Sequence, residues 1–294
     1  MPNYNFQTVD VFTDRMFGGN PLAVFPEASG MTTEQMQSLA MEFNLSETTF
    51  VLAPVDPVHT ARVRIFNKAG EMPFAGHPMV GTGFVLANLK LRGELMTFEV
   101  PAGVVKVHLK RDGRQIAGAT IDAPEALTLG AEFAPEEIAA TIGLTRGDVV
   151  TGSHPPLMAS VGNPYIIAEL RDAALDRAIP DARVFAEMVS NYPGLAGRFS
   201  LYVYAHKGQD LAARMFAPLS GTYEDAATGS AAAPLAGLLL SLSGRELDHY
   251  LIRQGEKMGR PSVLHASSYR DSEGIHASVG GSCVPVLRGE VTLL

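Results

Sequence analysis

Two short segments rich in small residues are the first candidates for chemistry in this sequence. They span residues 75–83 (AGHPMVGTG) and 226–232 (AATGSAA), and each opens an apolar stretch of helical length. Small residues at a helix start leave backbone N–H groups and the positive end of the helix dipole open to an anion. Two such starts facing each other could hold a carboxylate, although glycines there also simply permit close helix packing.

Polar residues at both starts favour a binding site over the packing explanation. His77 lies at the first start, and Asp225, Thr228 and Ser230 lie at the second. Glu47 is the other candidate, because a carboxylate can accept and return a proton. It lies between a predicted helix end and a predicted strand start, where a carboxylate is usually a solvated loop residue. Its position alone therefore does not single it out.

Several other kinds of site have no support in the sequence. The segment from Gly76 to Gly83 lacks the lysine and following Ser or Thr of a phosphate-binding loop. No Gly-x-Ser-x-Gly or His-Glu-x-x-His motif occurs, and the eight histidines show no ligand spacing. Cys283 is the only cysteine, which rules out an internal disulfide, a thiolate metal cluster and a pair of catalytic thiols. We expect no metal and no bound nucleotide.

Length and composition indicate a folded globular protein. A chain of 294 residues, 46% of them hydrophobic, can fill one large core or two ordinary ones. Its formal charge of -8, without a basic cluster, argues against a nucleic-acid partner. The alternation over residues 1–12 predicts a strand rather than a signal peptide, and the longest nearly apolar run, residues 231–240, is too short to cross a bilayer. We expect a cytoplasmic protein without a membrane partner.

The chain contains an internal repeat. Gly-Asn-Pro at residues 19–21 recurs at 162–164, and Arg-Ile-Phe at 64–66 is echoed by Arg-Met-Phe at 214–216. Each of the latter triplets precedes one of the two small-residue segments. Two matches in the same order, displaced by about half the chain, predict a duplicated domain rather than chance similarity of short tripeptides.

The apolar periodicity predicts a mixed α and β layout in each half, with short strands, a surface helix and an apolar helix after the small-residue segment. This pattern suggests a sheet wrapped around a central helix. A linker is predicted at Asp122–Ala134, where Pro124 and Pro135 flank a stretch without clear period. The expected helices are Thr33–Phe43 (N-cap Thr32 or Thr33), His77–Leu89, Pro135–Ile142, Asp181–Val189 and Gly229–Leu240, and the expected strands are Tyr4–Phe12, Leu22–Phe25, Thr48–Ala53, Ala61–Phe66, Thr97–Val100, Val104–Leu109, Ile116–Ile121, strands within Phe199–Phe216, and strands from Tyr250 onward.

Five motifs in order resemble those of the PhzF-like phenazine-biosynthesis isomerase family. They run through essentially the whole chain, and together they are far more specific than any one motif. They are residues 17–25 (FGGNPLAVF), 45–48 (LSET), 71–78 (EMPFAGHP), 224–231 (EDAATGSA) and 254–262 (QGEKMGRPS).

The resemblance implies the diaminopimelate-epimerase fold, an α+β fold of two pseudo-symmetric domains. In each, a barrel-like sheet wraps around a central apolar helix, and the site lies in the cleft between the domains. We assign residues 1–121 to the first domain, joined by a returning strand at 280–294, and 122–279 to the second. The epimerase branch carries a catalytic cysteine before each central helix, where this chain has Ala75 and Ala226, so two-thiol racemisation is ruled out.

The PhzF-like branch is thought to use one glutamate as both acid and base, a role that the resemblance transfers to Glu47. It also implies His77 and Asp225 as catalytic groups. Such a site removes a proton from carbon beside an unsaturated or carbonyl-like system and returns it to another carbon, without metal or organic cofactor. The implied partners are a small carboxylate substrate and a second copy of the chain in a homodimer. The implied substrate contacts are Asn20, Gly76, Thr228, Gly229 and Ser230.

Three functional hypotheses follow. The leading one is a cofactor-independent isomerase that moves a proton between carbons of a small amino- or hydroxy-carboxylate. The second is a racemase or epimerase that works with one carboxylate and a second acid such as Asp225. The third is a catalytically silent binding protein, against which the joint retention of the site residues counts. Two features depart from the family pattern: Ala226 stands where a proline is common, and Pro234 should kink the second central helix.

Overall fold

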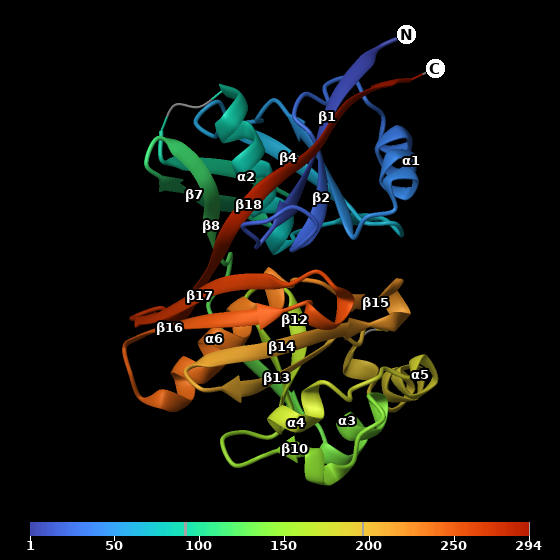
Figure 1. Cartoon of the computed structure of the whole chain (residues 1–294), viewed down its shortest axis with the longest axis vertical. Helices are drawn as coiled ribbons and strands as arrows, with labels where there is room; N and C mark the ends of the chain where they lie inside the picture. Colours follow the sequence, from blue (N-terminus) through green and yellow to red (C-terminus); the bar gives the residue numbers. More distant parts are fainter. Residues whose placement is uncertain (91–92, 196, 294) are drawn as a thin grey trace.

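The computed structural model describes residues 1–90, 93–195 and 197–293. Figure 1 shows two lobes stacked along the long axis, with both chain ends in the upper lobe and the middle of the chain in the lower one. The first half contains helices α1 (Thr33–Phe43) and α2 (Gly76–Lys90) with strands β1 (Asn3–Val11), β2 (Asn20–Phe25), β3 (Glu47–Leu52), β4 (Ala61–Phe66), β5 (Glu71–Met72), β6 (Leu95–Val100), β7 (Gly103–Asp112) and β8 (Gln115–Asp122).

The second half has more short helices. Its helices are α3 (Pro135–Thr141), α4 (Asp172–Leu175), α5 (Ala182–Asn191) and α6 (Gly229–Ser243), and its strands are β9 (Thr128–Glu132), β10 (Val149–Val150), β11 (Leu157–Ser160), β12 (Pro164–Leu170), β13 (Leu201–Lys207), β14 (Asp210–Ala217), β15 (Thr222–Asp225), β16 (Leu247–Gln254), β17 (Ser262–Asp271) and β18 (Gly274–Thr292).

The strand pairings of the first half recur in the second. The parallel pair β2–β3 corresponds to β12–β13, and the parallel pair β4–β6 corresponds to β14–β16. The antiparallel pairs β3–β4 and β4–β5 likewise correspond to β13–β14 and β14–β15. The motif repeat in the sequence therefore does reflect a repeated structural unit, with α2 and α6 in equivalent places.

Both central helices are buried almost all round, as their apolar sequences predict. In α2 residues 76–87 are buried, and its interior glycines allow close packing: a Cβ on Gly81 would lie 2.6 Å from Leu22 Cδ2, and one on Gly83 would lie 2.6 Å from Val107 Cγ1. For these two glycines the packing explanation is correct. Pro234 lies inside α6, where it cannot donate the usual backbone hydrogen bond to the carbonyl of Ser230.

The stretch predicted as a linker, Asp122–Ala134, contains a strand that was not expected. Asp122 ends β8, and Thr128–Glu132 forms β9, which pairs with β11. All five residues of β9 are exposed, so the strand has no buried face and no alternation of apolar and polar residues that could have revealed it. The strands β11 and β12 were not predicted, and the predicted end of α6 was three residues too early. Helix α1 was predicted correctly, and its N-cap is Thr32.

Strand β18 crosses from one lobe to the other (Figure 1). It pairs first with β17 through Gly274–Gly280, then with β8, and finally with β1 through Cys283–Thr292. At the crossing, a Cβ on Gly280 would lie 2.1 Å from Thr120 Oγ1, which explains the glycine. The exact division at residues 121 and 122 stays a prediction.

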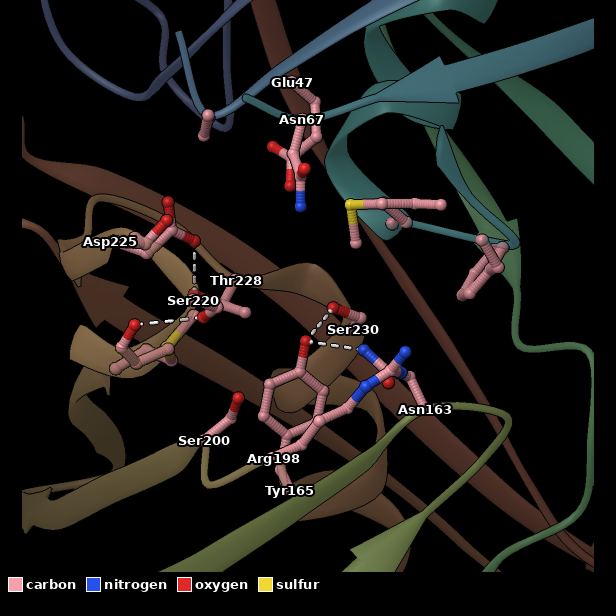
Figure 2. A pocket seen from close by; sticks show the side chains of 18 of the residues that line it. Glu47, Asn67, Asn163, Tyr165, Arg198, Ser200, Ser220, Asp225, Thr228 and Ser230 are labelled. Atoms are coloured by element: carbon pink, nitrogen blue, oxygen red, sulfur yellow. Dashed lines mark hydrogen bonds between the residues drawn. The ribbon is translucent and has the colours of Figure 1, made fainter. Parts of the chain in front are cut away.

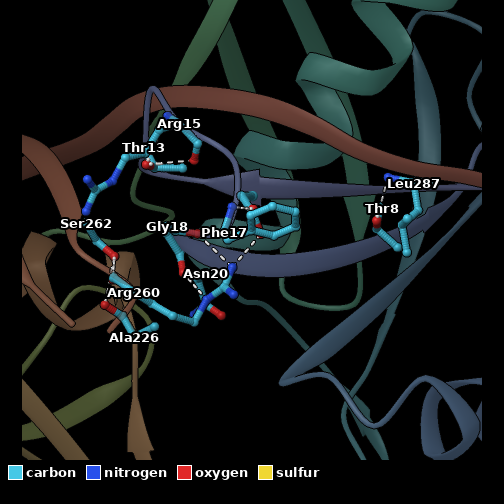
Figure 3. A network of polar contacts seen from close by, with 12 residues as sticks. Thr8, Thr13, Arg15, Phe17, Gly18, Asn20, Ala226, Arg260, Ser262 and Leu287 are labelled. Carbon is cyan, nitrogen blue, oxygen red and sulfur yellow. Dashed lines mark hydrogen bonds and ion pairs between the residues drawn. The ribbon is translucent and has the colours of Figure 1, made fainter. Parts of the chain in front are cut away.

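A polar network also joins the halves, and it connects two of the sequence motifs (Figure 3). Arg260 donates to the carbonyl oxygens of Gly18 (2.7 Å) and Gly19 (2.8 Å), and forms an ion pair with the buried Asp10. Asp10 in turn accepts from the backbone N–H of Phe17. The turn that leads into Asn20 at the start of β2 is thus fixed from the other half of the chain.

Candidate active site

A cavity of about 510 Å³ lies between the two halves. Figure 2 shows Glu47 and Asn67 on one side, with Asp225, Tyr165 and Ser230 on the other. Its lining includes the starts of α2 and α6, the end of β15 and the segment before β13, so neither half alone encloses it. The polar side chains of the lining are Ser46, Glu47, Asn67, Glu71, His77, Asn163, Tyr165, Arg198, Ser200, Ser220, Thr222, Asp225, Thr228 and Ser230.

Glu47 is the first residue of β3. Helix α1 ends at Asn44 in a left-handed conformation, and the chain then turns into β3, which places the Glu47 side chain at the cavity. The side chain is 16% exposed, and its Oε2 atom lies 3.4 Å from His77 Nε2 without hydrogen-bonding geometry. In the described part of the chain, the buried side-chain polar atoms without a partner are these two and Thr48 Oγ1. Such atoms are rare and call for a ligand or a functional reason.

The starts of α2 and α6 contact each other directly. A Cβ on Gly76 would lie 2.9 Å from the backbone nitrogen of Ser230 and 3.2 Å from the carbonyl carbon of Gly229. Glycine is required at position 76 for this approach. The two positive helix ends therefore converge at the cavity, the arrangement that suits a bound carboxylate.

Asp225 is held as a hydrogen-bond acceptor on both carboxylate oxygens. Asn20 Nδ2 donates to Oδ1 (2.8 Å) and Thr228 Oγ1 donates to Oδ2 (2.6 Å). The Asn20 amide also donates to the carbonyl of Ala227 and accepts from Ser46 Oγ, which fixes its orientation. Because the same Nδ2 faces His77 Nδ1 at 3.4 Å, His77 fits the tautomer that carries its proton on Nε2, toward Glu47.

The pKa values of three ionisable side chains in the site differ from their usual values. Burial, followed by the nearby charge of Asp225, raises the pKa of Glu47 to about 8. Burial also raises the pKa of Asp225 to about 6, while the hydrogen bonds from Thr228 and Asn20 act in the opposite direction. Burial lowers the pKa of His77 to about 3. At neutral pH the site therefore contains a neutral imidazole, an ionised Asp225 and a Glu47 that carries a proton.

Ser230, at the start of α6, belongs to a directed chain of hydrogen bonds (Figure 2). Asn163 Nδ2 donates to Tyr165 OH (3.0 Å), and Tyr165 OH lies 2.7 Å from Ser230 Oγ. Either hydroxyl can donate in this contact; because Asn163 donates to the tyrosine oxygen, the arrangement in which Tyr165 donates to Ser230 gives each oxygen one hydrogen to accept. The hydroxyl hydrogen of Ser230 is then free to point at a ligand in the cavity.

The structure brings together all but one of the residues implied by the resemblance. Glu47, Gly76, His77, Asp225, Thr228, Gly229 and Ser230 line the cavity. Asn20 does not line it. It is 1% exposed and lies behind Asp225, so its geometry fits a positioning role rather than the predicted substrate contact.

Nine polar residues of the described lining were not predicted as site residues, among them Asn67, Asn163, Tyr165 and Arg198. The Gly-Asn-Pro repeat contains Asn163 and leads into Tyr165, which could have drawn attention to both residues. Asn67 Oδ1 accepts from the backbone N–H groups of Ala69 and Gly70, which leaves its amide N–H₂ to the cavity. Arg198 is the only Lys or Arg of the described lining (Figure 2), and no pattern in the sequence distinguishes it.

Ionisable groups from both halves thus face one cavity in a two-lobed α+β fold (Figure 1). The sequence pattern of the family described as "Phenazine biosynthesis-like protein" matches residues 9–289. The chain belongs to this family.

Individual relatives agree with that membership. The chain is 36% identical to an uncharacterized isomerase of Mesorhizobium japonicum, with 99% of each chain covered. It is 33% identical to the trans-2,3-dihydro-3-hydroxyanthranilate isomerase of Pseudomonas aeruginosa, covering 99% of this chain and 100% of the relative. A crystal structure of a PhzF-family protein from Bacillus anthracis superposes with a TM-score of 0.88 at 25% identity over 100% of both chains. The predicted family, the diaminopimelate-epimerase-like fold and the enzyme class, isomerase, are confirmed.

The described residues contain neither a metal-binding group of side chains nor a membrane-spanning helix. No group of three or more His, Cys, Asp or Glu side chains there could hold a metal ion. No helix in the same part of the chain is long and apolar enough to cross a membrane.

Proposed function

We propose that this isomerase moves a proton between two carbons of a small amino- or hydroxy-carboxylate, with Glu47 as both base and acid and without a cofactor. The observation that supports this most is the pair of unpartnered buried atoms, Glu47 Oε2 and His77 Nε2, that face each other at 3.4 Å beside the cavity. A buried carboxyl with a pKa near the working pH can both accept and return a proton.

The reaction begins from the form in which Glu47 has lost its proton, which its pKa of about 8 makes the minor form at neutral pH. In that form Glu47 takes a proton from a substrate carbon. The C–H bond breaks, the proton binds to Glu47, and the electron pair enters the adjoining unsaturated or carboxylate system. The negative charge that develops there is stabilised by the backbone N–H groups at the starts of α2 and α6 and by the Ser230 hydroxyl. Asp225 is an ionised acceptor placed to hold an ammonium or hydroxyl group of the substrate.

In the second step, Glu47 returns the proton to another carbon of the same delocalised system. The Nε2–H of neutral His77 faces Glu47 and can stabilise its carboxylate before the first step and after the second. Substrate and product then have the same atoms and charge, so the chemistry of the cycle needs no further reactant. The Pseudomonas aeruginosa relative is named for isomerisation of trans-2,3-dihydro-3-hydroxyanthranilate, which is consistent with a small amino-carboxylate as substrate here.

The substitution Glu47→Gln tests the proposal. Gln has the size of Glu but cannot accept the proton, so we expect kcat to fall at least about a hundredfold. The assay would use trans-2,3-dihydro-3-hydroxyanthranilate and then small amino- and hydroxy-carboxylates that protect the chain against thermal unfolding. Glu42→Gln, the same change at an exposed position on α1, should retain wild-type activity. A Glu47→Gln enzyme that keeps more than about a hundredth of its activity would show that another group is the base.

Epimerisation is the second candidate, because Asp225 is a second carboxyl at the same cavity. Turnover in deuterated water separates the two reactions. A proton shift places deuterium on a new carbon, whereas epimerisation places it at the inverted centre. The expected homodimer and cytoplasmic location stay predictions.

A further inference from the structure

A buried group of polar side chains lies behind Asp225, on the side away from the cavity. Gln254, the last residue of β16, is 1% exposed, and Tyr202 of β13 is fully buried beside it. Neither side chain lines the cavity, and the proposed reaction uses neither of them. Gln254 nevertheless begins one of the five sequence motifs.

The backbone fixes the orientation of the Gln254 amide. Its Nε2 donates to the carbonyl oxygen of Asp225 (2.9 Å), and its Oε1 accepts from the backbone N–H of Thr228 (3.2 Å). A carbonyl can only accept and an N–H can only donate. Reversing the amide would therefore set two acceptors against each other and two donors against each other.

This orientation determines the direction of the next hydrogen bond. Gln254 Nε2 also donates to Thr228 Oγ1 (3.0 Å), so the threonine oxygen receives a hydrogen from the amide. The hydroxyl then directs its own hydrogen to Asp225 Oδ2, 2.6 Å away. With Asn20 Nδ2 on Oδ1, both oxygens of Asp225 accept hydrogens, which stabilises the ionised form.

We propose that Gln254 is a positioning residue that aims the Thr228 hydroxyl at Asp225 and so keeps Asp225 ionised, which leaves the mobile proton of the site on Glu47. This inference rests on the proposed role of Glu47. Without the amide, the Thr228 hydroxyl could turn and accept a hydrogen from protonated Asp225, and the proton would be shared between two carboxyls.

The other charged and titratable groups around Asp225 are few in the described structure. Glu47 approaches from β3, His77 from α2, and Tyr165 and Tyr202 from β12 and β13; Glu224 precedes Asp225 and is paired with Arg214. Substitution of Gln254 or Thr228 leaves all of these groups in place. A change in the titration of Asp225 therefore reports the hydrogen bonds rather than a lost charge.

The test is a direct titration of Asp225 by carbon-13 NMR in the full chain labelled at aspartate carboxyl carbons, with the signal assigned by its loss in Asp225→Asn. No substrate is needed. We expect Gln254→Met to raise the pKa of Asp225 by about one pH unit, since the Thr228 hydroxyl is then no longer forced to donate and can accept a hydrogen from protonated Asp225. Thr228→Val should have the same effect, and the double variant should raise the pKa of Asp225 no further than Thr228→Val alone.

Tyr202→Phe is the matched control. It removes only the hydroxyl that donates to Gln254 Oε1 (3.1 Å), and the backbone of Asp225 and Thr228 still fixes the amide. We expect the pKa of Asp225 to change by less than about 0.3 in this variant.

An unchanged titration in Gln254→Met would overturn the proposal, as would an equal additional change when the Thr228 hydroxyl is already absent. If Gln254→Met does not fold, as judged by its circular dichroism and melting curve, Thr228→Val and Thr228→Ser decide instead. The valine must raise the pKa of Asp225 and the serine, which keeps the hydroxyl, must not. Failure of the proposed function would be seen separately, as an active Glu47→Gln enzyme whose Asp225 titrates as expected.

Discussion

Beside the start of α2, Glu47 Oε2 and His77 Nε2 have no hydrogen-bond partner, whereas at the start of α6 every side-chain oxygen of Asp225, Thr228 and Ser230 has at least one. The two helices occupy equivalent places in the repeated halves. Their surroundings nevertheless differ in how completely the polar atoms are satisfied within the protein.

This difference indicates a division of labour between the halves. An unsatisfied buried polar atom costs stability, and it persists where a substrate or a moving proton satisfies it. In the proposed mechanism the first half carries the proton, and the second half supplies fixed charge and oriented donors. Two copies of one structural unit can in this way carry different functional groups.

Asp225→Asn should produce the largest effect that tests this comparison. We expect kcat/KM to fall about a thousandfold, because a neutral amide cannot provide the fixed charge to the substrate. The charge of Asp225 also raises the pKa of Glu47, so its removal should move the pH dependence of kcat/KM to lower pH. Rates measured from pH 5 to pH 10 check both effects.

Glu224→Gln is the control for that experiment. Glu224 precedes Asp225 but forms a bidentate ion pair with Arg214 (2.8 Å for both contacts) away from the cavity lining. It should lower the melting temperature without moving the pH profile. A pH profile that moves equally in both variants would show that Asp225 has no special relation to Glu47.

A large effect on stability is expected from Glu47→Gln. The pKa of Glu47 rises from 4.5 to about 8 in the fold, so the folded state favours the protonated form. Its contribution is complete below about pH 4.5 and is lost as the pH rises to about 8. The variant should therefore match the wild type near pH 4.5 and be more stable by roughly 5 kcal/mol above pH 8, because each pH unit between the two pKa values contributes about 1.4 kcal/mol.

Urea unfolding at a series of pH values measures this difference. The depressed pKa of His77 acts in both proteins and cancels in the comparison. Glu42→Gln, on the exposed face of α1, should change stability by less than about 0.5 kcal/mol at every pH. A constant difference between Glu47→Gln and wild type across the range would mean that Glu47 is not buried as a neutral acid.

Much of the fold could be predicted from local signals. The Thr32 cap with Gln35 at the third position marks the start of α1, and the two apolar segments after small residues mark α2 and α6. Strand β9 could not be found, because an exposed strand has no buried face to impose a pattern. The short buried strand β12 gives an apolar run that periodicity alone cannot distinguish from a helix.

The site was less accessible to prediction, for a different reason. Asp225, Thr228 and Ser230 lie beside a recognisable helix start, so local sequence indicated them. Glu47 depended on the family resemblance, since its burial arises from packing between the halves. The function of Gln254 depends on contacts with residues 26 and 29 positions earlier, which only the folded chain brings together.

The smallest expected effect concerns the donor chain that ends at Ser230. Ser230→Ala removes the hydroxyl that faces the cavity, and we expect kcat/KM to fall about tenfold through the loss of one donor to the developing charge. Tyr165→Phe keeps that hydroxyl but removes the partner that directs it, so the loss should be about threefold and should appear mainly in kcat. Steady-state rates measure both, with the carboxylate that the assay of Glu47→Gln shows to be turned over.

Combining the two substitutions shows whether the chain of donors acts as one unit. Tyr165 OH and Ser230 Oγ are hydrogen-bonded at 2.7 Å, so once Ser230 is alanine the tyrosine hydroxyl has nothing left to direct. The double variant should then match Ser230→Ala alone, a non-additive result. If the two losses multiply instead, Tyr165 contacts the substrate by itself. The second half would then provide two independent hydrogen-bond donors rather than one donor whose direction is fixed by the other. The start of α6 would differ from the start of α2 in the number of its donor groups, not in their orientation.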